Sequence, residues 1–135
     1  MRALVTGASS GIGRAIAVQL LDQGWQVVAL CRNRPDLTEL VHVPVDLSDP
    51  AATRASLAGL GSFDAVIHAA GLLRVGRHET MDHSDGALMW RLHVGVAAEL
   101  VQALAPQMPD GGRIVLIGSR VAAGAAGRSL YAASK

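Results

Sequence analysis

The sequence predicts an α/β fold, a doubly wound parallel sheet with helices on both faces. First, short apolar stretches alternate with segments of helical periodicity along the whole chain of 135 residues. Second, the apolar stretches are continuous, as in parallel strands that are covered on both faces. Third, glycines and polar residues follow these stretches, and ligands of such sheets lie at the carboxyl ends of the strands. We expect one domain over residues 1–135.

The composition limits the classes of function. The formal net charge is +1 and no block of basic or acidic residues is present, so nucleic acid is not an implied partner. The longest apolar runs are too short to span a membrane, and no signal-peptide pattern opens the sequence. The single Cys31 rules out an internal disulfide and fits a reducing compartment, so we expect a cytoplasmic protein.

The first 24 residues predict a strand over 3–5, a glycine-rich turn and a helix over 12–23. Gly7 and Gly11 can adopt backbone angles closed to other residues and let a phosphate approach the main chain. Gly13 lets the helix pack closely, and the free N–H groups and dipole of the helix face the anion. The spacing G-x3-G-x-G differs from the commonest dinucleotide fingerprint, so alone it also fits an ordinary turn between strand and helix.

A second strand is expected over Gln26–Cys31, and Arg32 follows its end. In dinucleotide-binding folds the adenosine ribose lies at this point, where an acid favours a free 2′-hydroxyl and an arginine favours a 2′-phosphate. Because the sequence offers Arg32 and no acid, it favours NADP(H) over NAD(H). The alternative is that Arg32 and Arg34 are solvated loop charges.

The remaining elements continue the alternation of strands and helices. After an irregular link over 35–40, we expect a strand over 42–45, a helix over 51–60 capped by Asp49, a strand over 63–68, a helix over 85–107, a strand over 113–117 and a helix from 129. The long helix has an expected apolar face of Leu88, Leu92, Val96, Leu100, Val101 and Leu104. In the polar stretch 72–84, the spacing of His78, Glu79, Asp82 and His83 does not match a zinc-binding H-E-x-x-H motif, so we predict no metal site.

Three residues near the end of the sequence suggest acid–base chemistry. Tyr131 and Lys135 are four residues apart, so on a helix they share a face. A cation beside a phenol stabilises the phenolate and makes the group a better proton donor or acceptor near neutral pH. Ser119, just after the last expected strand, can hydrogen-bond a substrate carbonyl. Taken alone, the spacing of Tyr131 and Lys135 is more simply explained by an exposed helix pair.

Together these motifs resemble the short-chain dehydrogenase/reductase family, in its single-domain branch with a Rossmann-type sheet, over residues 2–135. The stretch Thr6–Gly13 matches the cofactor motif of that family. Asp46-Leu47 matches its adenine-contacting acid and the apolar residue that follows. His68-Ala69-Ala70-Gly71 stands where the family has Asn-Asn-Ala-Gly, so the last two residues match. Tyr131, Lys135 and Ser119 match the Y-x-x-x-K signature and the catalytic serine.

The resemblance implies an oxidoreductase that transfers a hydride between NADP(H) and a small-molecule carbonyl or alcohol. It implies that Tyr131 gives or takes the proton, that Lys135 tunes it and contacts the nicotinamide ribose, and that Ser119 positions the substrate oxygen. The implied cofactor-binding residues are Gly7, Ser9, Ser10, Gly11, Ile12, Gly13, Arg32, Asp46, Leu47, Ala69, Ala70, Gly71, Tyr131 and Lys135.

The sequence departs from the family at two places. In the family, an asparagine in the helix before the last of the expected strands holds a water in the proton relay. Counting back along this sequence from Pro106, the corresponding position is His93, which we include among the catalytic candidates. A histidine can hold a water or place a titrating group near Lys135, and the alternative is a helix residue with a buried hydrogen bond. Family members also continue well beyond the catalytic lysine, so we expect a fragment without the substrate-binding part, inactive by itself.

A second hypothesis is a nucleotide-binding module or regulatory subunit without turnover. The end of the chain and His93 motivate it, while the intact set of Ser119, Tyr131 and Lys135 argues against it. The helix over 85–107 and the one from 129 correspond to helices that pair across dimers in the family. The resemblance therefore also implies a homo-oligomer, a dimer or a tetramer.

Overall fold

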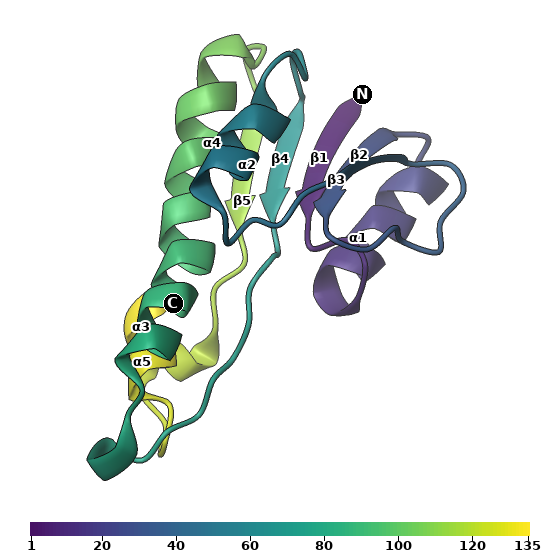
Figure 1. Cartoon of the computed structure of the whole chain (residues 1–135). Helices are drawn as coiled ribbons and strands as arrows, with labels where there is room; N and C mark the ends of the chain where they lie inside the picture. The colour runs from purple at the N-terminus through teal and green to yellow at the C-terminus, as the bar shows by residue number, and fades with distance from the viewer.

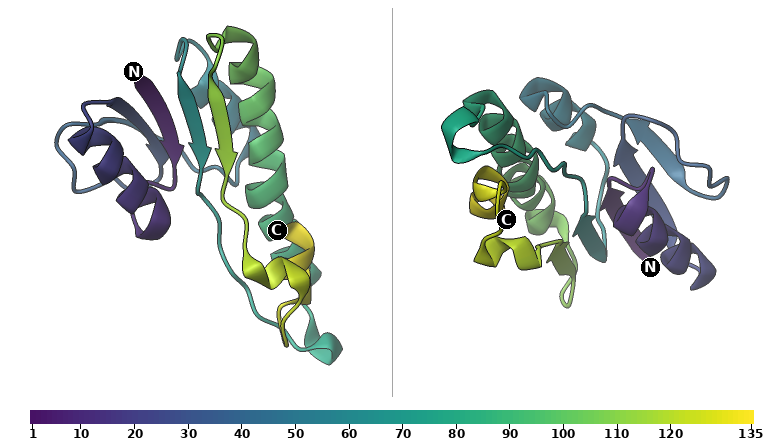
Figure 2. Two further views of the ribbon diagram at one scale, coloured as in Figure 1. Left: turned by 180° about the vertical axis from the view of Figure 1, so that it is seen from behind. Right: turned by 90° about the horizontal axis from the view of Figure 1, so that it is seen from below.

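The computed structural model describes residues 1–135 and contains a five-stranded parallel sheet in the order β3-β2-β1-β4-β5 (Figure 1). The strands are β1 (Arg2–Thr6), β2 (Gln26–Cys31), β3 (Val41–Pro44), β4 (Ala65–His68) and β5 (Arg113–Leu116). Helix α1 (Gly11–Asp22) covers one face, and α2 (Pro50–Leu57) and α4 (Val96–Leu104) cover the other (Figure 2). The predicted doubly wound Rossmann-type sheet is therefore confirmed, and its order of strands reverses beside β1.

Alternate side chains of the central strands fill two separate cores. Leu4 of β1 and Val66 of β4 pack on the side of α2 and α4, against side chains that include Leu57 and Leu100. The opposite face is built mainly from small side chains, among them Ala3, Val5, Ala29 and Ala17. Small residues on this face allow α1 to lie close to β1, which brings the amino end of α1 to the carboxyl edge of the sheet.

The two edge strands are less covered than the centre. In β5, Ile114 packs against the core under α4, whereas Val115 faces the other side and is 44% exposed. At the other edge, β3 contains Pro44 and lies one residue earlier than predicted. A proline has no backbone N–H to donate, so an edge strand is where it disturbs the sheet least.

Two element boundaries differ from the predictions for local reasons. Helix α2 ends at Leu57 rather than at residue 60, because Ala58 is extended and both Gly59 and Gly61 have positive φ, 73° and 76°. Strand β4 begins at Ala65 rather than at Phe63. Phe63 is buried in the core beneath the Arg2 guanidinium, whose carbon lies 4.4 Å from the ring centroid.

The helix predicted over 85–107 is a rod of four segments. Helix α3 (His83–Trp90) leads into a π-helical turn (Arg91–Gly95), then α4 and a 3-10 turn (Ala105–Gln107). The rod begins two residues earlier than predicted because the Asp82 carboxylate accepts the Ser84 N–H at 2.8 Å and caps it. The π-helical turn was not predicted, and it lies beside the functional site.

The outward face of the rod is apolar. Val101 was expected in the core but is 40% exposed, because the buried stripe runs through Val96, Leu100 and Leu104 instead. Trp90 is 55% exposed. We call the exposed residues Ala87, Trp90, Ala98, Val101 and Ala105 the outer stripe. No exposed residue between positions 86 and 107 carries a charge.

The segments after β4 and β5 run side by side beyond the carboxyl ends of the strands (Figures 1 and 2). The first contains a 3-10 turn (His78–Thr80), and the second contains a 3-10 turn (Arg120–Ala123). The second segment ends in α5 (Ser129–Ser134), which packs against α3. None of the helices combines the length and the hydrophobicity that crossing a bilayer requires.

Candidate cofactor cleft and active site

A cleft lies at the carboxyl edge of the sheet, where the order of strands reverses. It encloses about 1460 Å³ of empty space, including its open mouth. Every predicted cofactor-binding residue lines it except Tyr131 and Lys135: Gly7, Ser9, Ser10, Gly11, Ile12, Gly13, Arg32, Asp46, Leu47, Ala69, Ala70 and Gly71. The topology thus brings four separate stretches of sequence to one cleft, as the reversal of strand order requires.

The glycines of the first turn have the backbone geometry that their positions predicted. Gly7 and Gly11 have φ of 70° and 54°, a region that side-chain-bearing residues rarely adopt. A Cβ at Gly7 would lie 2.8 Å from the backbone nitrogen of Ala70. A Cβ at Gly13 would collide with the carbonyl oxygen of Gly7, so the close contact that Gly13 permits is with the turn itself.

The amino end of α1 is suited to hold an anion. Ser10 is the N-cap residue, but its side chain makes no capping hydrogen bond. The first-turn N–H groups of a 12-residue helix therefore face the cleft with the positive end of the helix dipole. This end fits the pyrophosphate of a dinucleotide.

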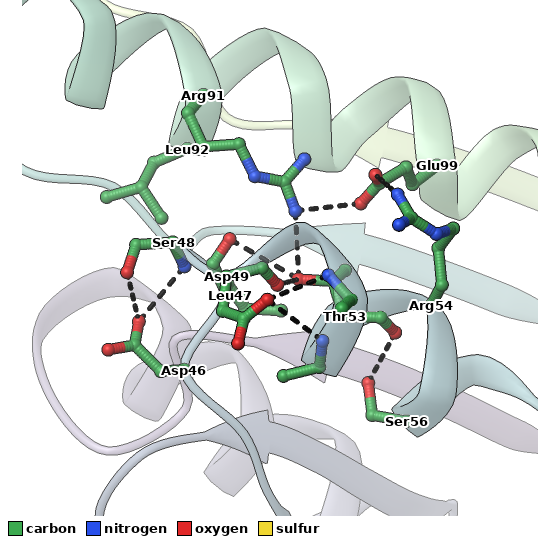
Figure 3. Close-up of polar contacts among 12 residues, drawn as sticks. Asp46, Leu47, Ser48, Asp49, Thr53, Arg54, Ser56, Arg91, Leu92 and Glu99 are labelled. Carbon is green, nitrogen blue, oxygen red and sulfur yellow. Dashed lines mark hydrogen bonds and ion pairs between the residues drawn. The ribbon is translucent and has the colours of Figure 1, made fainter.

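Two charged residues, Arg32 and Asp46, line the part of the cleft that follows β2 and β3. Arg32 and Asn33 follow β2 and line the cleft, with no acid beside them on that strand. Asp46 follows β3, and its carboxylate accepts from the Ser48 N–H at 3.0 Å and from the Ser48 hydroxyl at 2.8 Å (Figure 3). These two hydrogen bonds lower the pKa of Asp46, which therefore stays anionic and can accept a donor from a ligand.

The cleft also has walls that the sequence did not reveal. Leu72 and Arg74 enter it from the segment after β4, and Leu88 and Leu92 enter it from the rod. Both rod leucines belong to the predicted apolar face of the helix, and the structure places them in the cleft wall, because a helical period does not distinguish a core from a cleft wall. Cys31, expected as an ordinary strand residue, also lines the cleft, and burial raises the pKa of its thiol.

A buried hydrogen-bond network links the first turn to β4. The Thr6 hydroxyl accepts the N–H groups of Ala69 and Ala70 at 3.2 and 3.0 Å, and it lies 2.7 Å from Nδ1 of His68. The Nε2 of His68 lies 2.9 Å from the carbonyl oxygen of Leu92, in the π-helical turn. Burial is the main cause that lowers the pKa of His68, and the charge of Lys135 adds to it.

A second network surrounds His93, which is buried in the π-helical turn. The Leu72 N–H donates to its Nε2 at 3.2 Å, and its Nδ1 lies 2.9 Å from the Ser134 hydroxyl. That hydroxyl in turn donates to the carbonyl oxygen of Tyr131 at 2.9 Å. Burial, with a contribution from the Lys135 charge, lowers the pKa of His93 to about 4.

Tyr131 and Lys135 are neighbours, as predicted, because α5 forms. The Lys135 ammonium lies 5.9 Å from the centroid of the Tyr131 ring and donates to the carbonyl oxygen of Ile117 at 3.0 Å. Burial lowers the pKa of Lys135. A Cβ at Gly71 would lie 3.6 Å from this ammonium and 2.6 Å from Nε2 of His93, so both groups lie directly behind the cleft wall.

Ser119 lies at the amino end of the 3-10 turn after β5. Its hydroxyl oxygen accepts the Val121 N–H at 3.1 Å, which fixes the side chain and leaves its proton able to donate. Ser119 does not line the cleft.

The polar residues of the segment 72–84 serve local contacts. His78 lies with its Nε2 2.8 Å from the Ser129 hydroxyl, which joins this segment to α5. Asp82 is the N-cap of α3. Nowhere in the chain do three or more histidine, cysteine or carboxylate side chains lie together as a metal ion requires.

The start of the π-helical turn is fixed by a partly buried cation. Arg91 donates from Nη2 to the Thr53 hydroxyl at 2.9 Å and to the Glu99 carboxylate at 2.8 Å (Figure 3). Thr53 also donates to the carbonyl oxygen of Asp49, within the turn that follows Asp46. Arg91 therefore joins the rod to α2 and to the loop at the far end of the cleft.

Comparison with known proteins agrees with this arrangement. The sequence matches the family described as short chain dehydrogenase over residues 1–135. It is 31% identical over 141 aligned positions to a short chain dehydrogenase of Pseudocercospora fijiensis, covering 89% of this chain and 45% of the relative. It is 45% identical over 74 positions to the L-xylulose reductase of Mus musculus, covering 50% of this chain and 30% of the relative.

Among solved structures, a blue fluorescent protein from a metagenomic library, in complex with NADPH, superposes with a TM-score of 0.88 at 31% identity. The alignment covers 99% of this chain and 62% of that protein. The chain thus spans less than half the length of the two curated relatives and under two thirds of this structure.

Proposed function

The chain belongs to the short-chain dehydrogenase/reductase family, and we propose that it serves hydride transfer between NADP(H) and a small carbonyl or alcohol substrate. The observation that carries the proposal is the position of Lys135. Its ammonium lies beside the Tyr131 ring and directly behind Gly71, on the wall of a cleft that fits a dinucleotide. A proton-transferring pair thus adjoins the expected cofactor site.

The residues of the chain would divide the work as follows. The glycine turn and the amino end of α1 bind the pyrophosphate, and Leu47 and Asp46 contact the adenine. A nicotinamide dinucleotide held by these residues would supply or accept the hydride. Tyr131 gives the proton to the substrate oxygen during reduction, or removes it during oxidation. Lys135 places a positive charge beside Tyr131, and Ser119 donates its free hydroxyl proton to the same substrate oxygen.

The preference for NADP(H) rests on Arg32. This guanidinium lies at the end of β2 and lines the cleft without an acid beside it on that strand, so it can pair with a 2′-phosphate. The NADPH complex of the similar metagenomic protein supports nicotinamide dinucleotide binding. Replacing Arg32 by alanine should weaken NADPH binding at least tenfold and leave NADH binding nearly unchanged, because only NADPH has the 2′-phosphate. Equal weakening for both would contradict this preference.

NADPH oxidation with a panel of aldehydes and ketones tests the reaction on the complete natural protein. Tyr131→Phe should lower kcat at least a hundredfold and leave the Kd for NADPH nearly unchanged, because the substitution removes only the hydroxyl group that transfers the proton. Ser56→Ala, a substitution on α2 away from the cleft, is the control and should retain the rate.

A nucleotide-binding module without turnover is the competing function. Such a module would bind NADPH and reduce none of the compounds in the panel. Tyr131→Phe would change neither the rate of NADPH oxidation nor the Kd for NADPH. That combination of results would replace the oxidoreductase proposal.

We also propose a cytoplasmic homo-oligomer, a dimer or a tetramer, in which a second copy covers the outer stripe. The stripe holds Trp90 and Val101, both well exposed, and no charge interrupts it. Burying such a patch is favourable in proportion to its apolar area. Molar mass by light scattering tests this arrangement.

A further inference from the structure

Two buried histidines lie at the π-helical turn, His93 in the turn itself and His68 on β4 in contact with it. We propose that His68 and His93 are positioning residues, fixed as opposite neutral tautomers, that join the wall of the cleft to the backbone of Tyr131. The inference rests on the proposed function only for the role of Tyr131. The tautomers themselves follow from which partners can donate a hydrogen bond and which can only accept one.

The tautomer of His68 is set by a carbonyl group. Its Nε2 lies 2.9 Å from the carbonyl oxygen of Leu92, which can only accept, so Nε2 carries the proton. Its Nδ1 is then bare and accepts from the Thr6 hydroxyl at 2.7 Å. Thr6 is free to donate there because its oxygen already accepts two backbone N–H groups, from Ala69 and Ala70.

The tautomer of His93 is set by a backbone N–H group and is the opposite one. The Leu72 N–H can only donate, so Nε2 of His93 is bare. Its Nδ1 then carries the proton and donates to the Ser134 hydroxyl at 2.9 Å, which donates to the carbonyl oxygen of Tyr131. The chain of donors therefore has one direction, from the loop after β4 through His93 to α5.

Both nitrogens of the His93 ring are thus occupied by groups of the protein. A proton relay through the ring would have to break one of these bonds, whereas a positioning role uses both. The ring also lies edge-on to Tyr131, with centroids 5.5 Å apart and planes at 90°, which restrains the catalytic side chain directly.

The charges around the two rings favour their neutral forms. Lys135, directly after α5, acts on both rings through its charge, and His68 acts on His93 in the same way. A proton added to Nε2 of His93 would point at the Leu72 N–H and open the contact with the cleft wall. Burial is the main cause that lowers the pKa of each ring, and the charge of Lys135 adds to it.

Ring ¹⁵N NMR of the complete natural protein at pH 7.5 tests the tautomers without reference to activity. We expect the proton on Nε2 of His68 and on Nδ1 of His93, each in at least a ninefold excess over the other tautomer. The exposed His83 serves as the internal reference. A proton on Nε2 of His93, or exchange between its two nitrogens, would overturn the inference.

A pair of serine variants tests the positioning role. Ser134 and Ser56 each donate to the carbonyl oxygen three residues before them, at 2.9 and 2.8 Å, but only Ser134 also accepts from His93. Ser134→Ala should lower kcat about tenfold, with the Kd for NADPH within twofold of wild type, because a small displacement of Tyr131 slows the reaction. Ser56→Ala should stay within twofold in both. Equal rates for the two variants would contradict the role.

His93→Asn separates positioning from proton relay. The amide nitrogen of asparagine can still donate to the Ser134 hydroxyl, so kcat should fall less than in His93→Leu. The apparent pKa values of the pH–rate profile should stay unchanged in both variants. A shift of the profile in His93→Leu would assign His93 to proton transfer instead. If no substrate is reduced, the proposed function fails, and the NMR result still decides the tautomers.

Discussion

The neutrality of His93 predicts an acid-dependent stability that one substitution should remove. The unfolded ring takes up a proton as the pH falls through about 6.5, whereas the native ring remains neutral down to about 4. Between these values the unfolded state binds more protons than the native state, so the free energy of unfolding decreases as the pH is lowered. The contribution of His93 is complete above pH 6.5 and is lost as the pH falls through about 4.

The size of the effect follows from the two pKa values of His93. The interval from 6.5 to about 4 corresponds to about 3 kcal/mol of native-state stability. About 2 kcal/mol of this is lost between pH 8 and pH 5, where the unfolded ring is almost fully protonated and the native ring is not. The groups that face His93 are Lys135 and Tyr131 from α5 and His68 from β4.

Urea unfolding of the complete natural protein at pH 8 and pH 5 measures this difference. Wild type should lose about 2 kcal/mol more stability between the two pH values than His93→Asn. His68 also titrates below its ordinary pKa, but it is present in both proteins and its contribution largely cancels. His83→Asn, a change at an exposed histidine, should behave like wild type. Equal losses in wild type and His93→Asn would refute the assignment of a neutral, buried ring.

Three further substitutions test other contacts. Gly13→Ala should lower stability by about 1–3 kcal/mol and weaken NADPH binding, because its methyl group meets the glycine turn, whereas Gly118→Ala points into open space and should change neither. Glu99→Gln should lower the unfolding free energy by about 2 kcal/mol in chemical denaturation, because Arg91, only 17% exposed, would lose its charge partner. Trp90→Glu should reduce the molar mass in light scattering to that of a monomer, and an unchanged mass would place the interface elsewhere.

Much of the fold could be predicted from the sequence because its signals are local. Strand β2 has the predicted limits, and α1 begins within one residue of the prediction, since an apolar run and a glycine turn define them without distant contacts. The errors occur where tertiary contacts override the pattern. Phe63 lies before β4 rather than in it and packs in the core, and Val101 is exposed because the buried stripe of α4 runs through Val96, Leu100 and Leu104.

The sequence by itself determined the order of strands and helices, the glycine turn and the residues that gather at the carboxyl edge of the sheet. Those features depend on backbone freedom and periodicity, which neighbouring residues encode. Only the tertiary structure decided that Leu88 and Leu92 form a cleft wall and that Arg91 pairs with Glu99. It also decided the roles open to His93, because the donors and acceptors around a ring come from segments distant in sequence, here residues 72 and 134.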